Sequence, residues 1–304
     1  MATDTLVEQV LETAAGSARM AAVGASDVAG ALTPGAGGHP DDWLDAWDPD
    51  YIRKTVPALH SLMRLYFRCE VDGLSNIPAE GPVLLVGNHS GGTLIADTFV
   101  FAQAFYRHFS PLRRFHQLAH DLVFRVPGAR ASLSRWGTVP ASPENMRRAL
   151  DRDAALLVYP GGDHETYRPS WESSKIDFAG RTGFARLALE HDIPVVPVVA
   201  IGGQETALFL GQGRGIARRL RLDKLARLKV FPGQIAPPFG LTILDLPGRV
   251  PLPAKISVRA LKPIDLRKRL GRSPDPDDAY ELVTGTMQDE LDDMAAERIL
   301  PVVG

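Results

Sequence analysis

One segment of the chain carries the residue types needed to move a proton at a carbonyl centre. It reads Gly87-Asn-His-Ser-Gly-Gly92, and Asp97 is the first carboxylate after it. An imidazole titrates near neutral pH and can take a proton from an attacking alcohol, while a carboxylate holds its tautomer and offsets the imidazolium charge. The segment therefore predicts His89 as a general base and Asp97 as its partner. Asn88 and Ser90 are predicted to contact substrate, and Asn88 also to steady the loop.

A second segment with ionisable side chains, Tyr159-Pro-Gly-Gly-Asp-His-Glu-Thr-Tyr-Arg168, follows another apolar run. Glycine amides in such a turn can point at an oxyanion, and an arginine can hold a phosphate or carboxylate with its planar fork. Glu165 is a second candidate partner for His89. The predicted substrate-binding residues here and just downstream are Gly161, Gly162, Arg168 and Arg181.

Apolar runs alternate with longer amphipathic segments along most of the chain, a pattern typical of a sheet covered by helices. Strands are expected at residues 69–73, 83–86, 115–119, 155–159, 194–199 and 255–261. Helices are expected at 95–108, 143–152, 180–191, 214–227 and 276–298, after an amphipathic helix that follows Pro49. The sequence thus predicts an α/β fold with a mixed or largely parallel central sheet flanked by helices. Ligands of such sheets bind beyond the carboxyl ends of the strands, where both candidate segments lie.

The composition is that of a globular chain, with 304 residues, 45% apolar side chains and a formal net charge of −2. It excludes a collagen, a disordered tail and a nucleic-acid-coating protein. The single cysteine, Cys69, excludes an intrachain disulfide and any multi-cysteine metal site. Residues 1–40 contain ten Ala and six Gly, which predicts a flexible tail. Residues 41–304 contain no clear linker and are expected to form one domain.

Four segments resemble, in order, the four sequence blocks of the glycerolipid acyltransferase superfamily, which includes glycerol-3-phosphate and lysophosphatidate acyltransferases. They are Asn88-His89 with Asp97, Gly137–Ser142, Tyr159–Glu165 and Ile193–Pro197, and the resemblance covers about residues 68–265. The Pro-Gly-Gly-x-x-Glu arrangement of the third block and the segment Arg181–Ala188 look more like the diacylglycerol acyltransferase branch. The first block departs from the family pattern, since seven residues rather than four separate its histidine from its aspartate. The second block has Ala141-Ser142 where the family often has an arginine, and Ser142 before Pro143 also fits a helix N-cap.

The resemblance implies that 41–304 is an acyltransferase domain. Such an enzyme moves a fatty acyl group from acyl-CoA or acyl carrier protein to a hydroxyl of a glycerolipid, such as lysophosphatidate, a lysophospholipid or diacylglycerol. His89 would be the base and Asp97 its orienting partner, with Glu165 in reserve. No metal, no covalent acyl-enzyme and no cofactor other than acyl-CoA as co-substrate would be required, because the thioester already contains a good leaving group.

Two other activities are compatible with parts of the pattern. Ser90 lies in a segment close to a nucleophile elbow, so an α/β-hydrolase-type esterase is an alternative. It would need a histidine late in the chain, and only His164 and His191 are available. His116 and His120 are four residues apart and could place two ring nitrogens on one helical face for a metal, but a single pair supplies too few ligands.

Residues 214–229 hold seven basic residues and one acid among regularly spaced Leu and Ile, and an apolar loop is expected over 231–246. A basic amphipathic helix of this kind suits an anionic membrane surface. A non-catalytic membrane-lipid-binding module is therefore a further alternative, whereas nucleic acid is not an expected partner. Without a secretory signal or a spanning apolar stretch, the sequence predicts a cytoplasmic protein peripheral on the inner face of the cell membrane.

Overall fold

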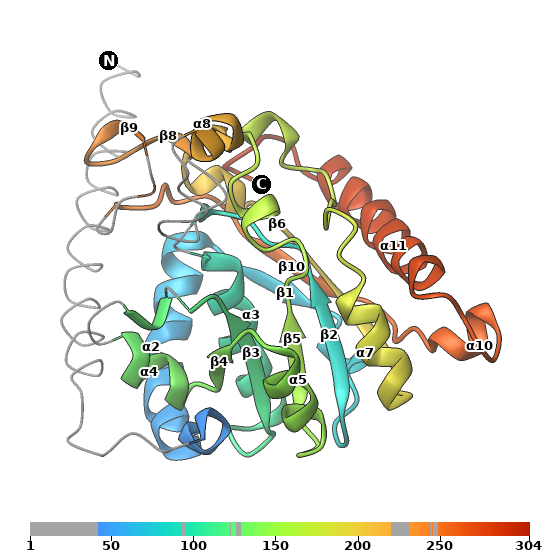
Figure 1. Ribbon diagram of the computed structural model, residues 1–304. Helices are drawn as coiled ribbons and strands as arrows, with labels where there is room; N and C mark the ends of the chain where they lie inside the picture. Colours follow the sequence, from blue (N-terminus) through green and yellow to red (C-terminus); the bar gives the residue numbers. More distant parts are fainter. Residues whose placement is uncertain are drawn as a thin grey trace.

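The computed structural model describes residues 42–92, 95–121, 123–125, 129–219, 232–243, 245 and 249–304. The predicted tail over 1–40 and most of the expected helix 214–227 lie outside these ranges. A seven-stranded sheet in the order β1-β10-β6-β2-β5-β3-β4 forms the centre of the molecule (Figure 1). Its strands are β1 (Glu70–Asp72), β2 (Val83–Gly87), β3 (Phe115–Ala119), β4 (Thr138–Pro140), β5 (Ala155–Val158), β6 (Val195–Ile201) and β10 (Ser257–Ala260).

The sheet is mainly parallel. Strands β4, β3, β5, β2 and β6 run in one direction, whereas β10 is antiparallel to β6 and β1 is parallel to β10. The apolar run of β2 is buried on both faces, as expected of a central strand covered by helices on each side. Leu84 and Val86 pack into one core layer, and Val83 and Leu85 pack into the other. The predicted α/β class and largely parallel sheet are confirmed.

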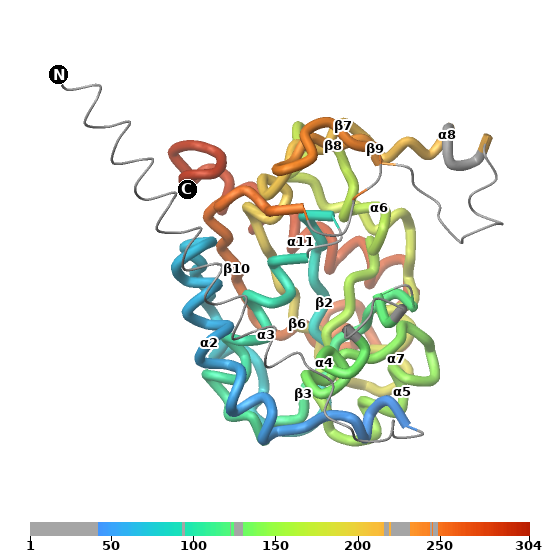
Figure 2. The backbone as a smooth tube through the Cα atoms, turned by 90° about the vertical axis from the view of Figure 1, so that its left-hand side faces the viewer, coloured from blue at the N-terminus to red at the C-terminus, as the bar shows by residue number. Residues whose placement is uncertain are grey.

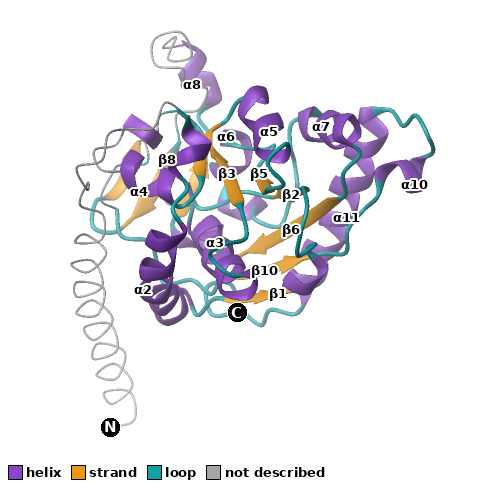
Figure 3. Ribbon diagram, turned by 90° about the horizontal axis from the view of Figure 1, so that it is seen from below, coloured by secondary structure: helices purple, strands orange, loops and turns teal. Residues whose placement is uncertain are grey.

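Helices cover both faces of this sheet. Apolar stripes of α2 (Pro49–Phe67) and α3 (Ala96–Phe109) pack on one face, and those of α5 (Pro143–Leu150), α7 (Gly183–His191) and α11 (Pro276–Ala296) pack on the other. Figures 2 and 3 show the two helical layers on opposite sides of the strands. Shorter helices are α4 (Ala129–Arg135), α6 (Asp163–Thr166), α8 (Arg214–Arg219) and α10 (Leu266–Leu270). None of the helices in the described ranges combines the length and apolar character needed to cross a bilayer.

Local capping explains where two of these helices begin. Asp48 accepts hydrogen bonds from the amides of Asp50 and Tyr51, and Pro49 occupies the first position of α2. Ser142 Oγ accepts from Asn145 N at 3.1 Å, which confirms the N-cap predicted for α5.

A second, three-stranded antiparallel sheet was not expected from the sequence. It consists of β7 (Leu208–Gly211), β8 (Gly233–Ala236) and β9 (Gly240–Ile243), in that order. The prediction of an apolar loop over 231–246 was therefore wrong for the described part of that range. The strands are four residues long and contain or border glycine and proline, so their alternation was too short to recognise. Strand β4, which has three residues, was missed for the same reason.

Candidate active site

The two candidate segments meet because their strands are neighbours in the sheet. Strand β2 lies between β5 and β6, and its residue Val86 is opposite Val158 and Pro197. The three strands are parallel, so the loops that follow them lie at the same edge of the sheet. This edge is where ligands bind in open α/β sheets.

His89 lies on the loop after β2 and faces Asp97. The His89 Nδ1 atom is 3.5 Å from Asp97 Oδ2, and the side chains are 13% and 2% exposed. Nδ1 is buried and makes no hydrogen bond, so the carboxylate is its nearest charged partner. The distance is longer than a hydrogen bond, as is common for catalytic pairs without substrate.

Asp97 reaches the loop because α3 begins only one residue before it. Its Oδ2 atom accepts the Ser90 amide at 3.0 Å and the Ser90 hydroxyl at 3.2 Å. Ile95, before the helix, has a left-handed backbone with φ 36°. The loop and the first turn of α3 thus bring together two residues that are separated by seven others. A carboxylate in the first turn is also favoured by the helix dipole.

Tyr159 stacks on His89, a role that the sequence did not indicate. The ring centroids are 4.2 Å apart with an interplanar angle of 18°, and Tyr159 OH accepts from Thr98 Oγ1 at 3.0 Å. Burial and the Asp97 carboxylate raise the pKa of the Tyr159 hydroxyl well above 10, so the phenol stays neutral. Gly87 makes room for the ring, since a Cβ atom there would lie 2.6 Å from it. The stacked ring limits His89 to one plane.

Glu165 contacts the main chain of His89. Its Oε2 accepts the His89 amide at 3.0 Å, and its Oε1 accepts the Asp177 amide at 3.2 Å. Oε1 also lies 3.4 Å from Arg168 Nη1, in an ion pair that is almost fully buried. Burial raises the pKa of Glu165 from 4.5 to about 7 despite these donors. The geometry therefore gives Glu165 a positioning contact with His89, whereas Asp97 is the carboxylate next to the ring.

Arg168 completes this contact from the other side. Its Nη2 donates to the carbonyl oxygen of His89 at 3.4 Å, and its Nη1 donates to the carbonyl of Lys175. Together Glu165 and Arg168 hold the amide and the carbonyl of His89, and we call them the His89 brace. Gln204 links the brace to the loop, since it accepts from Gly91 N at 3.0 Å and donates to the Arg168 carbonyl at 2.5 Å. Sequence reasoning missed Gln204.

Asn88 ties the catalytic loop to the neighbouring strand. Its side-chain amide donates to the Ala200 carbonyl at 2.8 Å, and its side-chain oxygen accepts the Ala200 amide at 2.8 Å. This pair of bonds continues the β2–β6 ladder by one step beyond the end of β2. The contact fits the predicted steadying of the loop, and it occupies both polar ends of the side chain.

Arg181 and the glycine pair shape the turn after β5. Arg181 Nη1 donates to the carbonyls of Pro160 at 3.0 Å and Gly161 at 2.8 Å, and Nη2 pairs with Asp163 at 2.9 Å. Gly162 has φ 46°, and its amide donates to the Tyr159 carbonyl at 3.1 Å. Gly162 N–H is therefore engaged within the turn, which leaves Gly161 N–H as the better of the two predicted oxyanion donors.

Replacing Gly161 with alanine should lower kcat about tenfold or more, because a Cβ atom would lie 2.3 Å from Glu165 Cγ and Oε2. Glu165 would have to move away from the His89 amide. The assay is release of free thiol from an acyl thioester in the presence of acceptor. Gly285→Ala in α11, with open space around its Cβ, is the matched control and should keep full activity. Equal activity of both variants would contradict the role of the brace.

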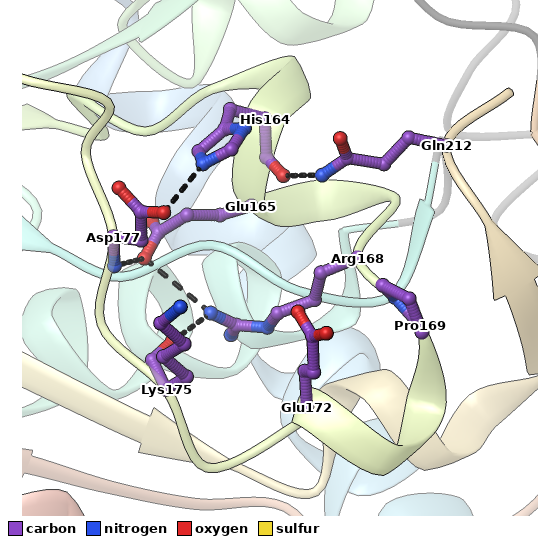
Figure 4. Close-up of a pocket in the computed structure, with 8 residues that line it drawn as sticks. All are labelled: His164, Glu165, Arg168, Pro169, Glu172, Lys175, Asp177 and Gln212. Atoms are coloured by element: carbon purple, nitrogen blue, oxygen red, sulfur yellow. Dashed lines mark hydrogen bonds and ion pairs between the residues drawn. The ribbon is translucent and has the colours of Figure 1, made fainter. Parts of the chain in front are cut away.

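A polar cleft of about 230 Å³ opens beside the brace. It is lined by His164, Glu165, Arg168, Pro169, Glu172, Lys175, Asp177 and Gln212. Figure 4 shows the Arg168 guanidinium between Glu165 and Lys175, and the His164 ring against Asp177. The cleft thus places charged groups of both signs next to the loop that contains His89.

The histidines needed by the alternative activities have other partners. His164 Nε2 is 2.8 Å from Asp177, His191 Nδ1 is 3.8 Å from Asp151, and the Ser90 hydroxyl donates to Asp97. His116 lies on strand β3, so it does not share a helical face with His120. It is fully buried, and burial lowers its pKa to about 4.

Comparison with known protein sequences gives three similarities. The Acyltransferase family model matches residues 68–201. The uncharacterized protein Rv0502 of Mycobacterium tuberculosis is 30% identical over 219 residues, which cover 72% of this chain and 58% of that protein. The DGAT1/2-independent enzyme synthesizing storage lipids of Bos taurus is 29% identical over 166 residues, which cover 54% of this chain and 48% of that protein. The chain therefore spans about half the length of these relatives.

A solved structure shares the fold. The 1-acyl-sn-glycerophosphate (LPA) acyltransferase PlsC of Thermotoga maritima superposes with a TM-score of 0.53 at 15% sequence identity. The match covers 82% of each chain. The similarity at this identity concerns the arrangement of strands and helices that surrounds the site.

Proposed function

We propose that the chain is a member of the glycerolipid acyltransferase superfamily that transfers a fatty acyl group from an acyl thioester to a hydroxyl of a glycerolipid. The observation that supports this most directly is the buried His89 Nδ1 facing Asp97 at the carboxyl end of β2. The donor is acyl-CoA or acyl carrier protein. The acceptor is lysophosphatidate, a lysophospholipid or diacylglycerol.

In the proposed reaction, His89 Nε2 takes the proton of the acceptor hydroxyl. The hydroxyl oxygen at the same time forms a bond to the carbonyl carbon of the thioester. The tetrahedral intermediate then collapses, the carbon–sulfur bond breaks, and the thiolate leaves with the proton from the imidazolium. Asp97, next to Nδ1, offsets the positive charge that the ring gains between the two steps. The Gly161 amide is the proposed donor to the oxyanion.

The polar cleft is proposed to hold the charged part of a substrate. It contains the Lys175 ammonium and borders the brace that fixes His89, so a phosphate there would lie close to the reacting atoms. Arg168 and Arg181 are already bonded to carbonyl oxygens of the protein, and we therefore assign them to shaping the site. Because the acceptors are membrane lipids, the protein is proposed to act as a peripheral protein on the cytoplasmic face of the cell membrane.

Incubation of the purified chain with labelled acyl-CoA or acyl carrier protein and a panel of acceptors tests the proposal. The panel contains lysophosphatidate, lysophospholipids, glycerol phosphate and diacylglycerol. We expect label in one glycerolipid product, with one free thiol released for each acyl group transferred. Release of labelled fatty acid to water alone would instead favour the esterase. Vesicle binding with no transfer to any acceptor would favour the lipid-binding module.

A further inference from the structure

The β7–β9 sheet exposes one apolar face. The face consists of Leu208, Leu210, Ile235, Leu241 and Ile243, of which Leu241 and Ile243 are 67% and 63% exposed. Phe239, in the turn between β8 and β9, is exposed beside it. A soluble protein rarely exposes so many large apolar side chains together without a partner.

The strand register makes this face a continuous surface. Leu208 pairs with Ile235, and Ile235 pairs with Leu241, so the three side chains form one row across the sheet. Residues at alternate positions, Phe209 and Gln234, are buried on the opposite face. The sheet therefore buries one face and exposes the other, and the exposed face is the one made of large apolar side chains.

The buried face of the same sheet holds the catalytic loop. Phe209 lies against Gly92, where a Cβ atom would be 3.0 Å from its ring. Arg249 pairs with Asp245 at 2.6 Å, both side chains being 2% exposed, and donates to the Gly91 carbonyl at 2.5 Å. The orientation of the exposed apolar face is thus fixed relative to the loop that contains His89.

We propose that the apolar face of the β7–β9 sheet inserts into the surface of an anionic lipid bilayer. Figures 1 and 2 show this sheet at one end of the molecule, with α8 at the same end. Helix α8 follows β7 and begins the segment 214–229, which has seven basic residues and one acid. An apolar surface flanked by basic residues binds bilayers that contain acidic lipids. The inference rests on the proposed function, in which the acceptor is a membrane lipid.

Trp171 gives a further anchor at the edge of this surface. It is 69% exposed on a short 3-10 helix, Ser170–Glu172, that is bonded to β7 through Ser170 Oγ and the Phe209 amide at 2.9 Å. Tryptophan is favoured at the boundary between lipid and water.

The test compares the full chain with the double variant L241T/I243T in binding to vesicles, with and without phosphatidylglycerol in phosphatidylcholine. Threonine keeps the β-propensity of these exposed positions, so folding should be unaffected. We expect the variant to bind anionic vesicles at least tenfold more weakly, while its activity on a water-soluble, short-chain acceptor is unchanged. Leu112→Thr, at a position that is 68% exposed in the loop between α3 and β3, is the matched control and should bind like the unaltered chain.

Three results would overturn the inference: no vesicle binding by the unaltered chain, equal binding by the double variant, or a dimer that the double variant dissociates. The last would assign the face to contact between copies. The proposed function fails separately. If the unaltered chain binds vesicles through this face but transfers no acyl group, the membrane surface is supported and the proposed activity is contradicted.

Discussion

Replacing His89 with alanine should lower the rate of acyl transfer by about 10²- to 10⁴-fold, the usual contribution of a positioned general base. His89 is partly exposed and contributes little to the core, so the variant should keep its fold. The expected loss is in kcat, because the imidazole acts on the proton and not on the affinity for the donor. Free-thiol release from acyl-CoA with acceptor present measures it, and thermal unfolding verifies the fold.

Ser90→Ala is the discriminating control for this prediction. It removes one hydrogen bond to Asp97 but leaves the Ser90 amide bonded at 3.0 Å, so the activity should stay within about tenfold of the unaltered chain. Loss of activity in Ser90→Ala together with retention in His89→Ala would favour a serine esterase. Full transfer by both variants would refute the role given to His89.

The sequence predicted the fold because its strongest signals were local. Val83–Val86 and the run 194–199 are nearly uniform in apolar character, which is typical of strands buried on both sides. Their order along the chain with intervening helices leads to a parallel sheet, and this places the segments after β2 and β5 at one edge. His89, Asp97 and Glu165 were therefore found as a group.

The contacts within that group depend on packing that no local pattern encodes. Spacing alone left open whether Asp97 or Glu165 lies beside the His89 ring, and the left-handed Ile95 before α3 is the feature that turns Asp97 inward. Tyr159 and Gln204 had no signal, because an aromatic residue ending a strand and a glutamine after a glycine pair are both common in cores and loops. The Tyr159 ring stacks on His89, and the Gln204 amide bonds to Gly91 and Arg168. These contacts arise only because the ends of three different strands lie next to one another.

Replacing Glu165 should affect both the rate and the stability. In Glu165→Ala the Arg168 guanidinium, 4% exposed, would lose its counter-charge, and removal of one partner from a buried pair costs about 3–5 kcal/mol. Glu165→Gln keeps the size and can still accept from His89 N, but its NH₂ group would face the donors Asp177 N and Arg168 Nη1. A small displacement of His89 should lower kcat by up to about 10²-fold with little change in the KM for the donor.

The pH dependence of stability reports the burial of the Glu165 carboxyl. Burial raises the pKa of Glu165 from 4.5 to about 7, so the native chain holds a proton that the unfolded chain has lost between these values. The free energy of unfolding contributed by this group is therefore present below pH 4.5 and is lost as the pH rises through 7. In Glu165→Gln, the decrease in the free energy of unfolding between pH 4.5 and 7, which we call the pH slope, should vanish. Chemical denaturation at several pH values measures it.

The change in kcat and the change in the pH dependence of stability must occur together if Glu165 positions His89. A carboxyl that only filled space would change the pH slope and leave kcat intact, whereas a general base would shift the pH–rate profile and leave the main chain of His89 where it is. The positioning role predicts a lower kcat in Glu165→Gln with the same acceptor preference. The reason is that the Asp97–His89 pair is retained and only the orientation of His89 changes slightly. Glu165→Asp, with a shorter side chain of the same charge, should recover the pH slope but not the full rate.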